Sequence, residues 1–259
     1  MLIDSHVNLH AHQYDEDRDA VIDRARAAGI ELMVTICDKI PSFEAVHAIA
    51  LKEADIWCTV GAHPHEAKDH VDLTTAHLVE LAARPKVIGI GETGLDFHYD
   101  LSPRDIQADV FRAHVAAARQ TGLPLVVHTR EADDIMGDIL EEEHARGPFK
   151  ILMHCYTSGA ALAKRAAALG AWFSVSGIAT FKQAQDVRDI IADMPADKII
   201  LETDCPYLAP VPMRGRRNEP AYLPHVLDKL AEIRGWTRAE AEQRTENAFF
   251  ALFDRIPRP

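Results

Sequence analysis

Short apolar runs recur along the whole chain and predict its strands. They are Leu2–His6, Leu32–Cys37, Ile56–His63, Val87–Gly91, Leu123–His128, Ile151–Cys155, Ala171–Ser176 and Ile199–Asp204. Nearly continuous apolar runs of this length are typical of strands that are buried on both faces, as in a parallel sheet.

The segments between these runs repeat apolar residues at helical spacing and predict a helix after each strand. They are Asp15–Ala28, Ser42–Ala54, Thr74–Ala83, Pro103–Thr121, Ala132–Ala145, Ala160–Leu169, Gln183–Asp193, Pro220–Arg234 and Arg238–Phe253. Gly29, Gly122 and Gly170 stand where three of these helices should end, since glycine readily terminates a helix. Ser102 followed by Pro103 predicts an N-cap with proline in the first helical turn.

About eight strands, each followed by a helix, predict a closed (β/α)8 barrel of the TIM type, with an additional C-terminal helix. An open doubly wound sheet is the alternative, but it would usually carry a glycine-rich phosphate loop after an early strand. The first turn, Asp4–His10, contains no glycine. The 259 residues suit one such barrel, which we expect to form a single domain over residues 1–259.

Composition restricts the partners of this chain. Its formal net charge is −12, whereas a general nucleic-acid coat protein is more often basic. An anionic substrate would therefore have to be attracted locally, by metal ions and a few arginines. The N-terminus enters an apolar strand without a basic leader, and no stretch approaches the ~18 apolar residues of a membrane span. We therefore expect a cytoplasmic protein with no membrane partner, and a monomer because no long exposed apolar stripe stands out.

Histidines and carboxylates stand at the ends of five predicted strands. They are His6, Glu92, His128, His154 and Asp204. Because the carboxyl ends of parallel strands meet at one mouth of a barrel, we expect these side chains to converge. Imidazole nitrogen with carboxylate oxygen suits Zn²⁺ or Mn²⁺, and the carboxylates shift the preference towards Mg²⁺. The pattern predicts a metal-dependent hydrolase with one or two divalent ions per chain, since paired ions can activate water and stabilise a leaving oxygen.

At these residues the chain resembles the TatD-type metal-dependent deoxyribonucleases, which belong to the amidohydrolase-like barrels. The resemblance covers essentially the whole chain. The strongest segments are Gly61-Ala62-His63-Pro64-His65, Gly89-Ile90-Gly91-Glu92-Thr93-Gly94-Leu95-Asp96, His128-Thr129-Arg130, His154-Cys155-Tyr156-Thr157-Ser158-Gly159, Glu202-Thr203-Asp204-Cys205-Pro206-Tyr207-Leu208 and Arg217-Asn218-Glu219-Pro220.

The resemblance implies a role for each ligand. Glu92 would bridge two metal ions, His128 and His154 would bind one of them, and His6 with residue 8 would bind the other. Asp204 would bind metal and accept a proton from the attacking water. The implied substrates are DNA ends or other phosphodiesters, with 3′→5′ exonuclease activity in some members, while some relatives remove D-amino acids from tRNA.

The first motif departs from the pattern of the family. Its usual opening is Asp-Ser-His-x-His-Leu-Asp, whereas this chain has Asn8 in place of the second histidine and His10 in place of the last aspartate. His6 and Asn8 share one face of a strand, so position 8 still reaches the metal. An amide oxygen is a harder and weaker donor than imidazole nitrogen. We therefore expect one site to be weakened and biased towards Mg²⁺ or Mn²⁺, with His10 or His12 as alternative ligands from the following loop.

Four further residues are candidate substrate contacts. His63 ends the third predicted strand and is a candidate for phosphate or metal, with packing against Pro64 as the structural alternative; His65 follows it. Arg130 comes two residues after a ligand histidine and should share its face, and Arg217 lies in a loop rich in proline and arginine. Arginine forks suit phosphate oxygens, although a solvated basic loop is the alternative explanation.

Three functions are consistent with this sequence. The first is a metal-dependent phosphodiesterase that acts on DNA or RNA ends, and the arginines beside the site favour it. The second is a metal-dependent deacylase, such as a D-aminoacyl-tRNA deacylase. The third is a binding protein with weakened catalysis, which the retained Glu92, His128, His154 and Asp204 disfavour.

Overall fold

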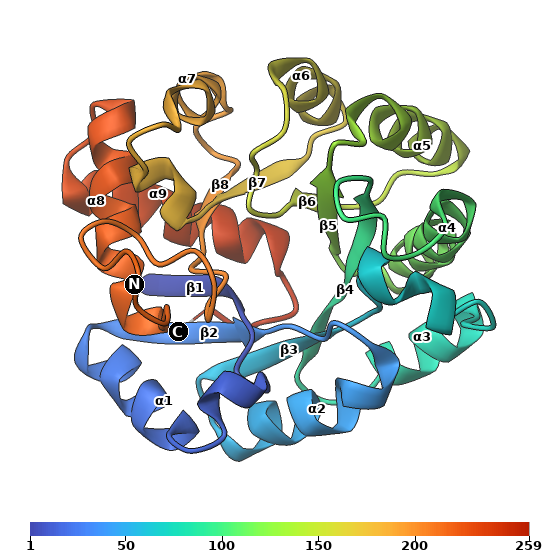
Figure 1. The fold of residues 1–259 in the computed structure, drawn as a ribbon, viewed down its shortest axis with the longest axis horizontal. Coiled ribbons are helices and arrows are strands. Elements are labelled where there is room, and N and C mark those ends of the chain that lie inside the picture. The colour runs from blue at the N-terminus through green and yellow to red at the C-terminus, as the bar shows by residue number, and fades with distance from the viewer. Residues whose placement is uncertain (259) are drawn as a thin grey trace.

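Eight parallel strands form a barrel in the computed structural model, which describes residues 1–258 (Figure 1). Neighbouring strands pair in chain order. A parallel bridge between Val7 and Cys205 joins the first strand to the segment that follows the last strand. The strands are β1 Leu2–Val7, β2 Ile30–Thr35, β3 Ile56–Val60, β4 Val87–Asp96, β5 Leu125–Arg130, β6 Ile151–Met153, β7 Trp172–Val175 and β8 Ile199–Leu201.

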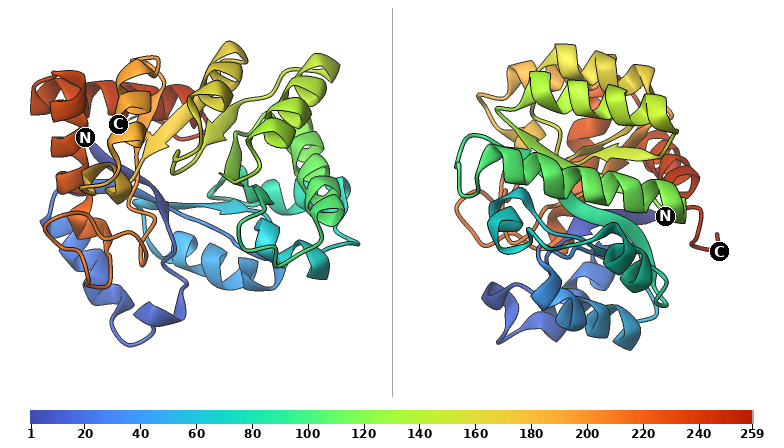
Figure 2. Two further views of the ribbon diagram at one scale, coloured as in Figure 1. Left: turned by 45° about the horizontal axis from the view of Figure 1, so that its top comes forward. Right: turned by 90° about the vertical axis from the view of Figure 1, so that its right-hand side faces the viewer.

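Helices lie around the outside of the strands, as the two views of Figure 2 show. They are α1 Arg18–Ala27, α2 Phe43–Lys52, α3 Thr75–Ala82, α4 Arg104–Thr121, α5 Asp133–Arg146, α6 Ala160–Ala168, α7 Gln185–Asp193, α8 Leu223–Arg234 and α9 Arg238–Leu252. Short 3₁₀ helices lie in the loops: η1 His12–Tyr14, η2 Ile40–Ser42, η3 Pro64–Asp69, η4 Gly177–Thr180 and η5 Pro220–Tyr222.

This arrangement confirms the predicted barrel, including the additional C-terminal helix, and excludes the open doubly wound sheet. Each predicted strand and helix overlaps the observed one. Among residues 1–258, no helix is both long enough and apolar enough to cross a membrane.

Strand β4 differs most from its prediction, because it continues past Gly91 to Asp96. Gly91 and Gly94 have φ angles of 124° and 147°, which side chains with a Cβ rarely adopt. A Cβ at Gly94 would overlap the carbonyl oxygen of His128 on β5, and a Cβ at Gly61 would overlap the backbone of Gly91. The glycines therefore let β4 lie close against both neighbours and carry Glu92 into the mouth of the barrel.

The expected N-cap at Ser102 is wrong. The Ser102 side chain is buried; its hydroxyl donates to the carbonyl oxygen of His65 at 2.9 Å and accepts from the backbone N–H of Lys68 at 3.1 Å. Pro103 occupies the N-cap position itself and makes no side-chain capping bond. The hydroxyl thus holds η3 against the start of α4, which fixes the loop that carries His65.

The inner faces of the strands are apolar where α9 covers them and polar at the opposite end. Val126, Leu152 and Ile200 belong to a core cluster with Phe249 of α9 and Phe253, the residue that follows this helix. The residues two positions further along these strands and their extensions are His128, His154 and Glu202. Because side chains alternate along a strand, these three share the inner face and point into the mouth.

Candidate metal centre

Glu92 lies at the centre of a group of histidines at the mouth of the barrel. Its Oε1 is 2.8 Å from His154 Nε2, 3.1 Å from His128 Nδ1 and 3.4 Å from His63 Nε2. Its Oε2 is 3.2 Å from His6 Nε2. Four strand ends therefore place an imidazole against one buried carboxylate.

These side chains form two overlapping groups of possible metal ligands. One is His6, Glu92 and His154, and the other is His63, Glu92 and His128; within each, the ligand atoms lie within 4.8 Å of one another. The shared carboxylate is suited to bridge two ions. The grouping differs from the one that the family resemblance implied, in which His128 and His154 share an ion.

The state of His6 shows that the residues fit a metal ion. Its ring is fully buried, and within residues 1–258 neither ring nitrogen forms a hydrogen bond. A buried imidazole that lies against a carboxylate but forms no hydrogen bond requires an explanation such as an ion. A set of imidazole nitrogens and carboxylate oxygens is the donor chemistry that Zn²⁺ and Mn²⁺ accept.

Asp204 lies beside this group but is oriented by Asn8. Its Oδ1 is 3.6 Å from His6 Nε2 and accepts a hydrogen bond of 3.4 Å from Asn8 Nδ2, which also donates to the Cys205 carbonyl at 3.1 Å. The structure thus places the amide nitrogen of Asn8 against the carboxylate, so the residue orients Asp204. His10, the other departure, pairs with Asp38 at 3.1 Å.

Two carboxylates that were not among the predicted ligands hold the histidine rings in place. Glu202 is fully buried, with Oε1 3.3 Å from His154 Nδ1. Asp96 Oδ2 is 3.0 Å from His128 Nε2 and 2.9 Å from His65 Nε2. Such outer carboxylates fix the orientation and basicity of ligating histidines. A signal for Glu202 was present in the sequence, because it directly follows the apolar run that predicts the last strand.

The titration of the group follows from burial and close charges. Burial alone would raise the pKa of Glu92, yet the surrounding histidines hold it well below its usual range. Burial likewise opposes a charged His154, but Glu92 and Glu202 raise the pKa of that histidine well above its ordinary value. Burial lowers the pKa of His63 to about 4 and raises the pKa of Asp204 to about 6. The metal-free site therefore combines an ionised Glu92 with an Asp204 whose pKa is raised to about 6.

A cavity of about 840 Å³ opens over these residues, and we call it the metal cavity. Its lining includes Asn8, Lys39, His63, Glu92, Arg130 and Asp204. His65 also lines it, as do the exposed rings of Tyr99 and Tyr207. The guanidinium of Arg130 lies 4.8 Å over the Tyr99 ring.

Of the two arginines predicted to contact substrate, only one lies at the metal cavity. Arg130 lines the metal cavity, whereas Arg217 does not: its guanidinium donates to both carboxylate oxygens of Asp17, at 2.9 and 2.7 Å, and to the carbonyl oxygen of Gln13 at 2.5 Å. These bonds fasten the loop that carries Arg217 to the segment before α1, so they occupy the donors that the sequence led us to expect on phosphate. Lys39, which follows β2, lines the metal cavity and was not predicted.

Comparisons with known proteins agree with this geometry. The chain matches the family described as TatD related DNase over residues 3–254. The Bacillus subtilis (strain 168) protein YabD, described as an uncharacterized metal-dependent hydrolase, is 39% identical over 249 residues, which are 96% of this chain and 97% of that protein. A Klebsiella pneumoniae (strain 342) protein named 3′-5′ ssDNA/RNA exonuclease TatD is 32% identical over 257 residues, with 96% and 97% of the two chains covered. The crystal structure of YjjV, a TatD homolog from Escherichia coli K12, superimposes with a TM-score of 0.91 at 26% identity, covering 99% of this chain and 98% of that one.

Proposed function

The chain belongs to the TatD related DNase family of metal-dependent hydrolases, and we propose that it is a phosphodiesterase that removes nucleotides from the ends of DNA or RNA. One observation carries the proposal: Glu92 is shared by two histidine pairs at the floor of a cavity that also presents Lys39 and Arg130. Two adjacent ions beside cationic side chains suit a phosphodiester better than a neutral amide.

Glu92 and the surrounding histidines His6, His63, His128 and His154 would hold one or two divalent ions, of Mg²⁺, Mn²⁺ or Zn²⁺. When bound, the ions supply Lewis-acid chemistry to water and to the leaving oxygen. The protein's own carboxylates orient the imidazoles, and this keeps the ligand atoms in position before substrate arrives.

Asp204 is the proposed proton acceptor for the attacking water. Its carboxylate lines the metal cavity, and Asn8 orients it through the amide bond described above. In the metal-free protein, burial raises the pKa of Asp204 to about 6, and the opposing influence of His6 and His154 does not cancel this rise. A general base is most effective when its pKa lies near the working pH.

Lys39 and Arg130 are the proposed phosphate contacts, together with His65 on the wall of the metal cavity. His63, which the sequence offered for phosphate or metal, is assigned to the ions. Within residues 1–258, neither cation forms an ion pair, so their donors are available to a substrate. They act against a chain whose formal net charge is −12, and the attraction is therefore local. We assign Arg217 a structural role, in which it holds its loop against Asp17, rather than a contact with substrate.

The preferred substrate is a single strand attacked at its 3′ end. The K. pneumoniae relative is named as a 3′-5′ exonuclease of single-stranded DNA and RNA. Tyr99 and Tyr207 at the rim of the metal cavity are 52% and 55% exposed, so their rings can stack unpaired bases. We also propose that the protein acts in the cytoplasm as a monomer.

The test is a metal-reconstituted activity assay. Protein stripped with a chelator and reloaded with Mg²⁺, Mn²⁺ or Zn²⁺ would be incubated with single-stranded oligonucleotides labelled at either end, and separately with D-aminoacyl-tRNA. We expect a ladder of products shortened from the 3′ end, abolished by Asp204→Asn. Turnover of the aminoacyl-tRNA without cleavage of oligonucleotides would instead assign the deacylase function, and cleavage that survives Asp204→Asn would reject the proposed base.

A further inference from the structure

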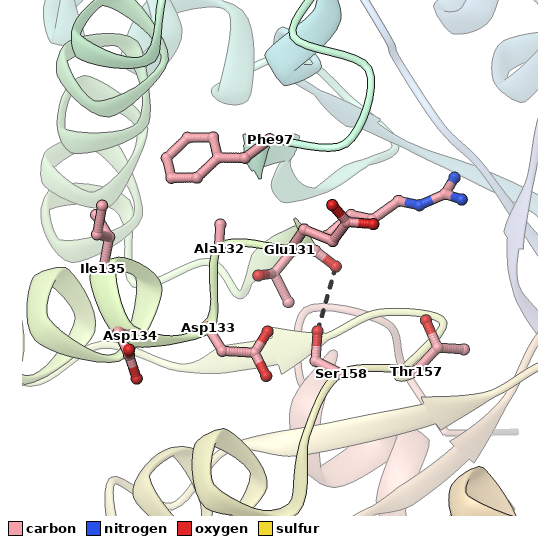
Figure 3. Close-up of a pocket in the computed structure, with 10 residues that line it drawn as sticks. Phe97, Glu131, Ala132, Asp133, Asp134, Ile135, Thr157 and Ser158 are labelled. Atoms are coloured by element: carbon pink, nitrogen blue, oxygen red, sulfur yellow. Dashed lines mark hydrogen bonds between the residues drawn. The ribbon is translucent and has the colours of Figure 1, made fainter.

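A second cavity adjoins the metal cavity, and we call it the side cavity. It has a volume of about 650 Å³. The loop after β4, the β5–α5 connection, the first turn of α5 and the loop after β6 form its walls (Figure 3). They contribute Phe97, Glu131, Ile135, Thr157 and Ser158.

The two cavities are continuous. Thr129, Arg130 and Thr157 line both of them. Arg130 is the cation at this border, and among the described residues it has no carboxylate partner. A strand whose terminal phosphodiester lies over Glu92 can therefore reach Arg130 and place a base in the side cavity.

The lining of the side cavity suits an uncharged planar group rather than a phosphate. Phe97, Ala132 and Ile135 supply apolar surface, and Ile135 is 47% exposed although it is aliphatic. In Figure 3 the Phe97 ring and Ile135 lie across the space from Ser158 and Thr157, whose hydroxyls are hydrogen-bonding groups. A planar base between these walls would bury apolar area and keep hydrogen-bonding edges satisfied.

The charges inside the side cavity exclude phosphate. Glu131, Asp133 and Asp134 line it. The carboxylate of Asp133 accepts the N–H of Gly159 at 2.7 Å and that of Glu131 lies 2.6 Å from His98 Nδ1, so both have protein partners. Three carboxylates against one border arginine repel a second phosphate, so a strand would keep its phosphates at Arg130 and turn a base inward.

We propose that the side cavity is the subsite for the base of the penultimate nucleotide, with Arg130 on the phosphate at the border. The proposal rests on the proposed function, because it requires a nucleic-acid strand at the metal cavity. The volume fits one nucleoside, since ligand pockets of 300–1,000 Å³ hold single small molecules. The side cavity would thus bind the penultimate nucleotide of the strand while the terminal nucleotide is removed.

The experiment compares an oligonucleotide that has all its bases with versions that lack one base, at the penultimate or at the third position. For the wild type we expect kcat/KM to fall about tenfold when the penultimate base is missing, because contacts to one base typically change binding by that order. Removal of the third base should have little effect. Equal kcat/KM on all three substrates would overturn the subsite.

Ile135→Glu tests whether this cavity is the one that contacts the base. Glutamate in the first turn of α5 is compatible with the helix, and it places a charge against the base. The quantity compared is kcat/KM on the intact strand divided by kcat/KM on the strand that lacks the penultimate base. We expect this ratio to fall from about ten in the wild type towards one in Ile135→Glu, and to stay near ten in Ile135→Leu. Val71→Glu makes the same change at an exposed aliphatic residue outside both cavities and should retain the wild-type ratio. An unchanged ratio in Ile135→Glu would reject the assignment.

Hydrolysis of bis(p-nitrophenyl) phosphate by the wild type separates the two proposals. This ester has no second nucleotide. If the wild type cleaves both the ester and the oligonucleotides, and a missing base does not change kcat/KM, only the proposed subsite is overturned. Protein that cleaves neither would overturn the proposed function and the subsite with it.

Discussion

Replacement of Glu202 by glutamine should weaken metal binding although Glu202 is not among the predicted ligands. The Glu202 carboxylate is fully buried; its Oε1 lies 3.3 Å from His154 Nδ1, and its Oε2 accepts a hydrogen bond of 2.5 Å from Ser174 Oγ. This contact directs His154 Nε2 towards Glu92, 2.8 Å away. Glutamine has nearly the same shape but removes the charge that makes the imidazole a stronger donor.

The expected loss follows from the geometry. Removal of an outer partner of a ligating histidine typically lowers metal affinity about 10- to 100-fold, which is roughly 1.4–2.7 kcal/mol at 1.36 kcal/mol per tenfold change. We expect the lower part of this range, because the glutamine carbonyl oxygen can still accept the N–H of His154 Nδ1. Glu202→Ala should lie at the upper end, since it also leaves the N–H of His154 Nδ1 and the hydroxyl of Ser174 without an acceptor.

The assay is competition for Zn²⁺ or Mn²⁺ against a chromophoric chelator at pH 8, together with thermal unfolding of the metal-free protein. Glu143→Gln is the matched control, because Glu143 is also a buried glutamate but pairs with Arg112 and Arg119 between the outer helices. The control should lose thermal stability and keep its metal Kd within about twofold. An unchanged Kd in Glu202→Gln would show that Glu202 only ties β8 to β7 through Ser174, and the reasoning above would fail.

Three further outcomes are expected. Asn8→His should strengthen metal binding at the site that includes His6, because imidazole is a stronger donor than an amide. The metal content should then come closer to two ions per chain, and unchanged stoichiometry in elemental analysis would contradict this. Burial opposes the charged form of His154, but the neighbouring glutamates raise its pKa well above the ordinary value, so at neutral pH the metal-free site holds a proton that the ion must displace. The metal Kd should therefore fall as pH rises, with proton release visible by calorimetry in buffers of different ionisation enthalpy, and a Kd independent of pH would refute the argument. Arg217→Ala should lower the melting temperature by about 1–3 °C through loss of the partly exposed pair with Asp17 and leave kcat/KM on oligonucleotides within about twofold; a tenfold fall in kcat/KM would instead support the phosphate contact.

The architecture was predictable because it depends on local patterns. Buried parallel strands require continuous apolar runs, and amphipathic helices require helical spacing, so both are visible along the chain. The convergence of His6, His128 and His154 was predictable for a related reason, since parallel strands all end at the same mouth. The expected N-cap at Ser102 failed because a buried hydroxyl found partners in η3, which no local pattern records.

The grouping around Glu92 was not predictable from local patterns. The alternation of side chains along a strand determines which residues face inward, but it does not determine how far one strand is shifted against the next. The close approach of β4 to its neighbours brings Glu92 against His63 and His128 as well as against His6 and His154.

The sequence by itself determined the barrel, the residue types at its mouth and the altered position at Asn8. Only the tertiary structure decided which imidazoles share Glu92, that Asn8 contacts Asp204 through its amide, and that Lys39 rather than Arg217 reaches the metal cavity. The physical reason is that the position of each strand follows from the local pattern of apolar residues. Contacts between side chains depend instead on how far neighbouring strands are shifted against each other, and on competing partners far along the chain. For Arg217 that competing partner is Asp17, which binds the guanidinium away from the mouth.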